Sequence, residues 1–367
     1  MLNIYGVTFD HTTNYGSCFQ AYALQQAIEK ISIGGENCSY FLIPIKTFKD
    51  YPINSFIKKV LIAPWLSYHR SKFIPFEKKY MKYVHCSKMT DLPELNEQAD
   101  AFVCGSDVIW NPDFNLQLGA YFLDFARKYK FSYAASFGKA KLSKEEIAFT
   151  KEHLASFDAV SVREKTSLMI AKKCTNKDIQ VVADPVLLLT PDEWSDVMEP
   201  SYVDKKIIFV YTTHLNEIFK SFIKKLKHQT GFQVILATWG PKQALKQGML
   251  SVQTPGQWLS LLQNAEFIVT NSFHATVFSV MFHKKFFTVV SGDKSQGINM
   301  RMNDFLNTLG LKDRIHSSVP DIIDTSEIDY ANTDACISQM RSRSLAYLHR
   351  NLVEAYRQKV RLTIRRT

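Results

Sequence analysis

Little in this sequence points to a metal framework, a disulfide framework or a membrane span. The cysteines lie far apart, and none of them forms a C-x-x-C pair; they are Cys18, Cys38, Cys86, Cys104, Cys174 and Cys336. This scatter argues against a zinc site and a disulfide framework, so we expect reduced thiols in a cytoplasmic protein. No apolar run is long enough to cross a bilayer, and the start, MLNIYGVTFD, has no basic residue, unlike a signal peptide.

Internal repeats, low-complexity tracts and nucleic-acid-binding motifs are also missing. We find no zinc-finger, RNA-recognition or basic-zipper pattern. The chain nevertheless has a net charge of +10, which favours an anionic partner. Since no nucleic acid is expected, an anionic metabolite and an anionic membrane surface are the better candidates.

What the sequence does contain is an alternation of short apolar strands with amphipathic helices. Its 367 residues, 46% hydrophobic and 22% charged, have the composition of a globular protein with more than one domain. The alternation predicts an α/β fold whose parallel sheets are joined by crossover helices. Strands are expected at 2–8, 38–43, 101–104, 131–136, 159–162 and 180–183, and again at 206–211, 233–238, 266–270 and 286–290.

A polar stretch at 191–202 divides this pattern in two. We therefore place an N-terminal domain at 1–190 and a C-terminal domain at 203–330. An amphipathic helix predicted at 332–359 dominates the last segment, 331–367, and is expected to pack back across both domains. Its basic tail, VRLTIRRT, could rest on acidic lipid or be a frayed end.

The most informative point is the junction between a strand and a helix in the second half. The strand predicted at 266–270 ends at Asn271 and Ser272, and the helix predicted at 273–283 follows directly. Free N–H groups and the helix dipole attract anions at such a junction. His274 falls in the first helical turn, where an imidazole can exchange protons near neutral pH. It could instead cap or pack, but its neighbours and strand-end position favour a functional role.

Two loops in the first half also follow strands and contain small and polar residues. Because the carboxyl ends of parallel strands meet at one edge of a sheet, both loops are expected to line a ligand cleft. Their candidate residues are Asn14, Tyr15, Gly16, Ser17, Gly105, Ser106 and Asp107. Gly16 would let the backbone approach a ligand closely, or it could belong to a plain turn.

Two arginines are candidates for binding an anion. Arg163 directly follows the strand at 159–162, and its guanidinium fork matches a carboxylate or a phosphate. The alternative is a salt bridge with Glu164 or another carboxylate. Arg301 begins a helix after the strand at 286–290, so it could face the same cleft or the surface.

Residues 45–82 differ from the rest of the chain. They mix lysine, arginine and aromatic residues with three prolines. We interpret them as a long excursion with short surface helices. Such a segment could touch a membrane or a lipid-linked acceptor, or form a solvated basic face over a minor core.

Several stretches, taken in order, resemble the polysaccharide pyruvyl transferase family. They are NYGSCFQAYALQ (14–25), FVCGSDVIWNP (102–112), FSYAASFG (131–138), SVREKTS (161–167), ADPVLLL (183–189) and TNSFHATVFSVMF (270–282). The resemblance covers nearly the whole chain. It implies two Rossmann-like domains facing each other across a cleft, as in GT-B glycosyltransferases. One position departs from the family pattern, because Ala275 stands where glycine commonly follows the histidine.

The resemblance also implies a reaction, the transfer of a pyruvyl group from phosphoenolpyruvate to a sugar of a bacterial capsular or exopolysaccharide precursor. It places the donor site at His274 and Arg163. We expect Arg301, Asn271 and Ser272 to help bind the donor, with His274 as the acid. The loops of the first half then form the acceptor side, for a sugar that is carried on lipid at the inner membrane face. No metal or other cofactor is expected.

Two other functions stay open at this point. A glycosyltransferase of the same architecture would use the same helix start for the diphosphate of a nucleotide sugar. A protein of the assembly pathway that binds glycan without catalysis would consume no phosphoenolpyruvate.

Overall fold

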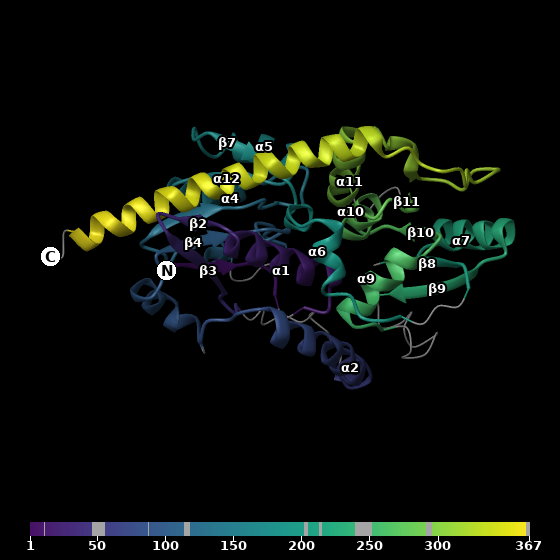
Figure 1. Ribbon diagram of the computed structural model, residues 1–367, viewed down its shortest axis with the longest axis horizontal. Coiled ribbons are helices and arrows are strands. Elements are labelled where there is room, and N and C mark those ends of the chain that lie inside the picture. Colours follow the sequence, from purple (N-terminus) through teal and green to yellow (C-terminus); the bar gives the residue numbers. More distant parts are fainter. Residues whose placement is uncertain are drawn as a thin grey trace.

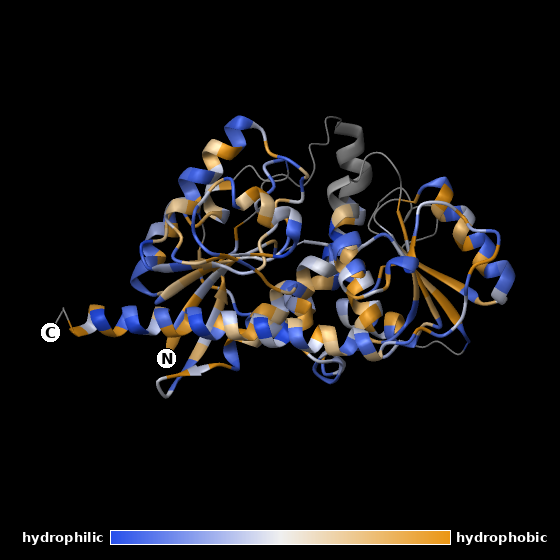
Figure 2. Ribbon diagram, turned by 90° about the horizontal axis from the view of Figure 1, so that it is seen from above, coloured by the Kyte–Doolittle hydropathy of each residue, from blue (hydrophilic) through white to orange (hydrophobic). Residues whose placement is uncertain are grey.

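The computed structural model describes residues 1–10, 12–45, 56–86, 88–113, 118–201, 205–212, 215–238, 252–290 and 296–364, with the backbone alone at 56–63, 238 and 296–299. Within them the chain forms two mainly parallel sheets that lie side by side, each covered by helices (Figure 1). The strands of the second sheet are almost entirely apolar, and the helices around both sheets turn polar faces outward (Figure 2). This is the arrangement expected for strands buried on both faces.

The first sheet has the strand order β2-β3-β1-β4-β5. Its strands are β1 (Leu2–Val7), β2 (Ser32–Ile33), β3 (Glu36–Leu42), β4 (Ala101–Cys104) and β5 (Tyr129–Ser132). All pair in parallel except β2, which is antiparallel to β3. Two further strands, β6 (Val160–Val162) and β7 (Ile179–Val181), pair with each other and continue the sheet beyond β5 through isolated bridges.

The second sheet has the order β12-β11-β10-β8-β9, and all its strands are parallel. They are β8 (Ile207–Thr212), β9 (Gln233–Thr238), β10 (Phe267–Thr270), β11 (Lys285–Val289) and β12 (Ile315–His316). Strands β8 and β10 lie in the middle and are buried along their whole length.

Helices connect the strands and cover the sheets. Around the first sheet lie α1 (Tyr15–Glu29), α2 (Phe56–Tyr80), η1 (Met89–Glu97), α3 (Leu118–Tyr121), α4 (Lys144–Ala155), α5 (Lys165–Ala171), η2 (Pro185–Leu188) and α6 (Pro191–Ser195). Around the second lie α7 (Glu217–Thr230), α9 (Pro255–Asn264), α10 (Phe273–Met281), α11 (Gln296–Thr308) and η4 (Lys312–Arg314). The long helix α12 (Ala331–Ile364) ends the described chain.

The helices that matter for the site start where local capping residues dictate. Asn14 caps α1 by accepting from the N–H of Gly16, and Ser272 caps α10 by accepting from the N–H of Ala275. Side chains of this type satisfy helix-start N–H groups that would otherwise have no partner. The two caps fix where α1 begins, after the loop that follows β1, and where α10 begins, shortly after β10.

The two halves share one continuous apolar core. Phe19 of α1 packs against Phe278 of α10 with ring centroids 5.3 Å apart, and Trp194 of α6 lies 5.0 Å from the same ring. Tyr15 stacks on Trp258 of α9 at 5.3 Å. Residues of both sheets belong to this cluster. Buried aromatic contacts of this kind join the halves firmly.

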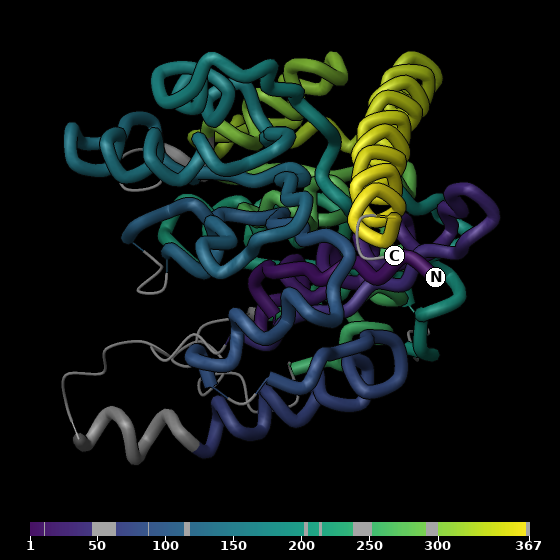
Figure 3. Tube along the Cα trace, turned by 90° about the vertical axis from the view of Figure 1, so that its left-hand side faces the viewer, coloured from purple at the N-terminus to yellow at the C-terminus, as the bar shows by residue number. Residues whose placement is uncertain are grey.

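Helix α12 binds both halves along one side of the molecule (Figures 1 and 3). Its 34 residues span about 50 Å at the usual rise per residue. Near its start, Asp334 pairs with His283 of the second half at 2.8 Å. Further on, Ser344 Oγ accepts from the N–H of Ala183 at 2.9 Å, and Tyr347 donates to the carbonyl of Ser132 at 3.0 Å. The predicted α/β architecture, with a terminal helix packed across both halves, is confirmed.

Two regions differ from the sequence-based expectation. Residues 56–80 form one helix, α2, rather than several short ones, although Pro64 and Pro75 lie within it; residues 46–55 of the predicted excursion lie outside the described residues. The polar stretch at 191–202, predicted as a linker, begins with the short helix α6. Trp194 of α6 and Val197 are buried in the shared core, and the domain boundary at this stretch stays a prediction.

Candidate functional site

The candidate site lies where the carboxyl ends of strands from both sheets meet. Asp107, Arg163 and Asp184 follow β4, β6 and β7 of the first half, and α10 brings His274 from the second half to the same place. None of these residues is more than 7% exposed. Four ionisable groups in one buried cluster are unusual, because burying a charge is costly unless it is paired.

Asp184 holds the arginine and the histidine together. Arg163 Nη1 donates to Asp184 Oδ2 over 2.7 Å, and His274 Nε2 lies 3.4 Å from the same oxygen. The other carboxylate oxygen accepts from the N–H of Val186 at 3.1 Å, at the start of η2. One carboxylate of the first half thus anchors an arginine of its own half and a histidine of the other.

Asp107 forms the second anchor. Ser17 Oγ donates to its Oδ2 over 2.8 Å, while its Oδ1 lies 3.7 Å from Arg163 Nη2 and 3.9 Å from Arg301 Nη1. Arg301 comes from α11 and is 8% exposed. The contacts explain why the two arginines, predicted from separate strand ends, lie in one cluster.

These charges shift one another's pKa values. Burial raises the pKa of Asp184, but His274 and Arg163 outweigh it and hold that pKa well below its usual range. Burial likewise raises the pKa of Asp107, and Arg163, His274 and Arg301 outweigh it in the same direction. For Arg163, burial lowers the pKa, but the surrounding carboxylates more than compensate and raise it. The carboxylates and Arg163 are therefore ionised at neutral pH.

Both guanidinium groups lie near the aromatic ring of Phe273. The Cζ atoms of Arg163 and Arg301 lie 4.7 and 5.8 Å from the centroid of its ring. Burial and the nearby Arg163 lower the pKa of Arg301 to about 10, so it is still a cation at neutral pH. Because an aromatic face attracts cations, Phe273 helps to keep two like charges close together.

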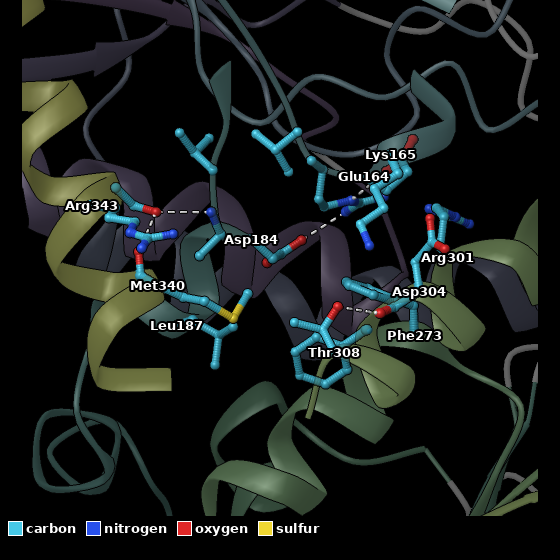
Figure 4. Close-up of a pocket in the computed structure, with 16 residues that line it drawn as sticks. Glu164, Lys165, Asp184, Leu187, Phe273, Arg301, Asp304, Thr308, Met340 and Arg343 are labelled. Atoms are coloured by element: carbon cyan, nitrogen blue, oxygen red, sulfur yellow. Dashed lines mark hydrogen bonds and ion pairs between the residues drawn. The ribbon is translucent and has the colours of Figure 1, made fainter. Parts of the chain in front are cut away.

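The arginines form part of the wall of a pocket of about 280 Å³ (Figure 4). Segments of both halves and α12 line it. Its charged lining residues are the cations Arg163, Lys165, Arg301 and Arg343 and the carboxylates Glu164, Asp184 and Asp304. His274 is not part of the lining, and its Nε2 reaches the pocket wall through Asp184.

Several buried polar atoms in this wall lack a hydrogen-bond partner. They are Arg163 Nε and Nη2, Arg301 Nε, Glu164 Oε2 and Asp304 Oδ2, and His274 Nε2 beside the wall is in the same condition. Such an atom costs about 1–3 kcal/mol when it stays unsatisfied. Because these atoms lie around one pocket, they indicate a binding site whose ligand supplies the missing hydrogen-bond partners.

Sequence comparison now identifies the family. The profile of the family described as polysaccharide pyruvyl transferase matches residues 14–293, which include both anchors and His274. The chain belongs to the polysaccharide pyruvyl transferase family. Membership in this family supports a transferase that acts in polysaccharide pyruvylation. Among proteins of curated function, none matches the chain in sequence.

Solved structures resemble the chain in fold. The S. aureus protein MnaA, solved with UDP, has a TM-score of 0.50 and 13% identity over 96% of this chain and 91% of its own. UDP-N-acetylglucosamine 2-epimerase from Rickettsia bellii has a TM-score of 0.47 and 11% identity, over 99% of this chain and 96% of its own. The E. coli heptosyltransferase WaaC with ADP has a TM-score of 0.38 and 12% identity, over 92% of this chain and 100% of its own. The likeness to MnaA supports the predicted GT-B arrangement of two Rossmann-like domains.

The structure shows what each of the four predicted cleft residues at 14–17 contacts. Gly16 lies against His274, since a Cβ atom at residue 16 would come within 2.1 Å of His274 Nδ1. The close approach expected at Gly16 is therefore to a side chain of the other half. Ser17 belongs to the site through Asp107. Asn14 caps α1, and Tyr15, predicted in the cleft, is only 2% exposed and bonds through its hydroxyl to the backbone of Gln253.

In the loop after β4, too, only some of the predicted cleft residues belong to the site. Asp107 lies in the charged cluster, but Ser106 is fully buried and bonds to Gln20, Thr8 and the carbonyl of Ala134. Gly105 packs so closely on Tyr133 that a Cβ atom would meet its carbonyl oxygen at 1.8 Å. Gly105 and Ser106 thus position Asp107 and lie away from the pocket lining.

The predicted donor residues Asn271 and Ser272 begin α10. Ser272 uses its hydroxyl as the helix cap, and its N–H donates to Thr270 Oγ1 at 3.0 Å. Asn271 is partly exposed beside it. Neither residue lines the pocket, so their binding of donor stays a prediction.

Sequence reasoning missed several residues of the pocket. Asp184 lies inside the family motif at 183–189 but is not among the site residues predicted from the sequence. The salt bridge of Arg163 with Glu164 or another carboxylate, the alternative stated for that arginine, is present with both Glu164 and Asp184. Asp304 and Arg343 lie on helices α11 and α12, and no local pattern singles them out. Burial raises the pKa of Asp304, with Lys165 opposing and Glu164 reinforcing the shift.

Two absences apply to the residues that the structure describes. Among them, no group of three or more histidine, cysteine, aspartate or glutamate side chains could hold a metal ion. In the same part of the chain, no helix combines the length and the apolar character needed to cross a membrane.

Proposed function

We propose that this chain transfers the pyruvyl group of phosphoenolpyruvate to two hydroxyls of a sugar in a bacterial capsular or exopolysaccharide precursor, with release of phosphate. The observation that carries the proposal is the pair of buried arginines, Arg163 and Arg301, which line one pocket together with the Phe273 ring that both contact. Phosphoenolpyruvate has two anionic groups, a carboxylate and a phosphate, and arginine forks match both.

In this proposal the unpartnered nitrogens bind the donor. Arg163 Nε and Nη2 hold one anionic group, and Arg301 Nε holds the other. Lys165 and Arg343 add positive charge to the same wall. Low accessibility to water strengthens each of these contacts.

The chemistry then proceeds by proton transfer to carbon. Since His274 lies behind Asp184 and does not line the pocket, its imidazole has to turn past that carboxylate when the donor binds. It then gives a proton to the methylene carbon, C3, which leaves a cation-like centre at C2. One acceptor hydroxyl attacks C2, the bond from C2 to the phosphate oxygen breaks, and the second hydroxyl closes the ketal. The two hydroxyl protons replace the one taken up by C3 and the one that leaves on phosphate. No metal or cofactor enters these steps.

His274 is the proposed acid because its Nε2 has no hydrogen-bond partner and lies 3.4 Å from the carboxylate that also holds Arg163. This contact couples the imidazole to the arginine that binds the donor. A charged donor bound beside Arg163 would therefore influence His274 electrostatically, both directly and through Asp184.

The test measures phosphate release from phosphoenolpyruvate with galactose-, mannose- and glucosamine-type acceptors. Wild type should release phosphate only with an acceptor, and His274→Ala should lower the rate about 10²- to 10⁴-fold. Arg301→Met should raise the KM for phosphoenolpyruvate about 10- to 100-fold. The exposed Arg350 of α12 provides the matched control, Arg350→Met, which should change neither value.

Release of a nucleoside diphosphate from nucleotide sugars, without phosphate release from phosphoenolpyruvate, would contradict the proposal and favour a glycosyltransferase. Glycan binding without turnover of either donor would favour a non-catalytic protein.

A lipid-linked acceptor and contact with the inner membrane face remain predictions. The last described turns of α12 expose Val360, Arg361 and Leu362, which suits an anionic lipid surface. Residues 365–367 of the basic tail lie outside the described residues.

A further inference from the structure

The pocket wall contains carboxylate oxygens that phosphoenolpyruvate cannot satisfy. Glu164 is 6% exposed, and its Oε1 accepts from Ser136 Oγ at 2.7 Å and from the hydroxyl of Ser167. Its other oxygen, Oε2, is buried without a hydrogen-bond partner and lies 3.6 Å from Arg163 Nε. Glu164 is therefore held by hydrogen bonds at one oxygen, while the second forms an ion pair with Arg163 and accepts no hydrogen bond.

Asp304, on α11, also has a carboxylate oxygen that accepts no hydrogen bond. It lines the same pocket from α11, and its Oδ2 is likewise buried without a hydrogen-bond partner. Lys165 and Arg301 lie in the wall with the two carboxylates (Figure 4). Two acidic side chains of one cavity wall, at the start of α5 and on α11, thus each have a buried oxygen without a hydrogen-bond partner.

The two sets of unsatisfied atoms call for different chemical groups. The arginine nitrogens are donors, and an acceptor-only anion such as phosphoenolpyruvate satisfies them. The carboxylate oxygens are acceptors, so they need O–H or N–H donors, which the ionised donor substrate does not have. A sugar diol supplies two O–H groups, and the proposed product is a ketal that bridges two hydroxyls.

We infer that Glu164 and Asp304 form the acceptor subsite, where each carboxylate receives one of the two sugar hydroxyls that the pyruvyl group will bridge. This inference rests on the proposed function. It places the acceptor beside the arginine pair, between α5 and α11, rather than on the loops after β1 and β4.

The same contacts give the carboxylates a part in proton movement. A hydroxyl hydrogen-bonded to a carboxylate is oriented and made more nucleophilic as its proton shifts toward that carboxylate. When the two C2–O bonds of the ketal form, the two O–H bonds break and their protons pass first to Glu164 and Asp304. One proton then restores His274, and the other leaves with phosphate.

The experiment separates donor binding from acceptor use. Glu164→Gln and Asp304→Asn keep the shape of each side chain but remove its charge. Calorimetric titration with phosphoenolpyruvate should give a Kd within about threefold of wild type for both variants, or tighter, because a negative charge has left the pocket. The same titration shows that the variants are folded.

Acceptor-dependent phosphate release should respond strongly. With the best acceptor of the panel, we expect kcat/KM for the acceptor to fall about 10- to 100-fold in each variant. Glu164→Asp, which restores a carboxylate, should recover part of the loss. Glu152→Gln and Asp192→Asn remove exposed carboxylates outside the pocket and should leave both constants unchanged.

A deoxy version of that acceptor, lacking one bridged hydroxyl, adds a specific readout. Because the deoxy sugar cannot close the ketal, its binding is measured instead of its turnover. One of the two variants should lose less affinity for the deoxy sugar than for the diol, because its partner hydroxyl is already gone. Unchanged acceptor kinetics in both variants, or a loss that parallels weaker donor binding, would overturn the acceptor subsite while leaving the proposed function intact. No phosphate release from wild type with any acceptor would overturn both.

Discussion

Asp184 illustrates how one residue can join two halves of a protein. Its Oδ2 contacts Arg163, which follows β6 in the first half, and His274, which lies on α10 in the second half. Removing one partner of a buried charge cluster leaves the others uncompensated, and this usually costs more than the cluster itself contributes. The residue is therefore important for stability as well as for the site.

Asp184→Asn should lower the free energy of unfolding by about 3 kcal/mol at pH 6–7. The pKa of Asp184 is lowered in the folded state, so the contribution of the ionised carboxylate is complete above the unfolded-state pKa, near 3.9. It declines as the pH falls below that value toward the folded-state pKa. Urea unfolding between pH 6 and pH 3 should show the gap between wild type and variant narrowing below about pH 4. A constant gap would contradict this linkage.

Gly16 is a second residue whose role depends on the other half. A Cβ atom there would come within 2.1 Å of His274 Nδ1 and 2.4 Å of its Cγ. Gly16→Ala should therefore displace the imidazole, with a loss of about 1–3 kcal/mol in stability and at least about tenfold in turnover. Phosphate release and thermal melting measure the two effects.

The control for Gly16→Ala is a glycine far from the site. Gly231 ends α7 with a φ of 72° and has open space around it. Gly231→Ala should cost about 1 kcal/mol through backbone strain alone and leave turnover unchanged. Equal activity losses in both variants would argue against the contact with His274.

At the scale of elements, α12 acts as a brace for the segment that carries Asp184. Ser344 accepts from the N–H of Ala183. Arg341 donates to the carbonyls of Leu187 at 2.7 Å and Leu189 at 3.1 Å. These contacts hold the turn from β7 into η2, where Asp184 is the capping residue.

Arg341→Met should loosen this brace. It leaves two carbonyl groups of buried residues without their donors, so we expect a loss of about 1–3 kcal/mol in the free energy of unfolding. Because the turn positions Asp184, the proposed function predicts that the KM for phosphoenolpyruvate also rises. Arg350→Met on the same helix should change stability by less than about 1 kcal/mol. Denaturant unfolding of both variants, with steady-state kinetics, makes the comparison.

The sequence was most informative about elements that local chemistry controls. Apolar runs placed β4 and β9, and the Thr254-Pro255 pair placed the start of α9. By contrast, α2 continues through Pro64 and Pro75, against the usual effect of proline. Its buried Phe73 and Phe76 pack against α1, so tertiary packing outweighs the local preference.

The candidate site shows the same limit. His274, Arg163 and Asp107 lie at strand ends, where the rules for parallel sheets predict ligand sites. Asp304 and Arg343 come from helices that reach the pocket only through the packing of α11 and α12. Their place depends on contacts between distant parts of the chain, which no local pattern encodes.

At the scale of the whole molecule, the shared core should make the chain unfold as one unit. Phe19 packs against Trp194 at 5.5 Å and Trp258 at 5.6 Å as well as Phe278, so neither half can lose its structure without exposing aromatic surface of the other. Calorimetry should show a single transition, with far-UV dichroism and tryptophan fluorescence changing together.

Phe19→Ala provides a direct test. It should cost about 3–5 kcal/mol and shift that one transition as a whole to lower temperature. Two separated transitions, in wild type or variant, would show that the halves fold independently.

The aromatic contacts between the halves also limit how this protein can diversify. In a two-domain enzyme with a loose interface, recombination can exchange one domain for that of a relative and so combine a new acceptor with an old donor. Here the contact between the halves is formed by α1, α6, α9 and α10, and the site itself includes residues from both halves. A chimera cut at residue 200 would inherit mismatched rings and a mismatched Asp184–His274 contact. New acceptor specificity should therefore arise by substitutions within the pocket rather than by exchange of halves.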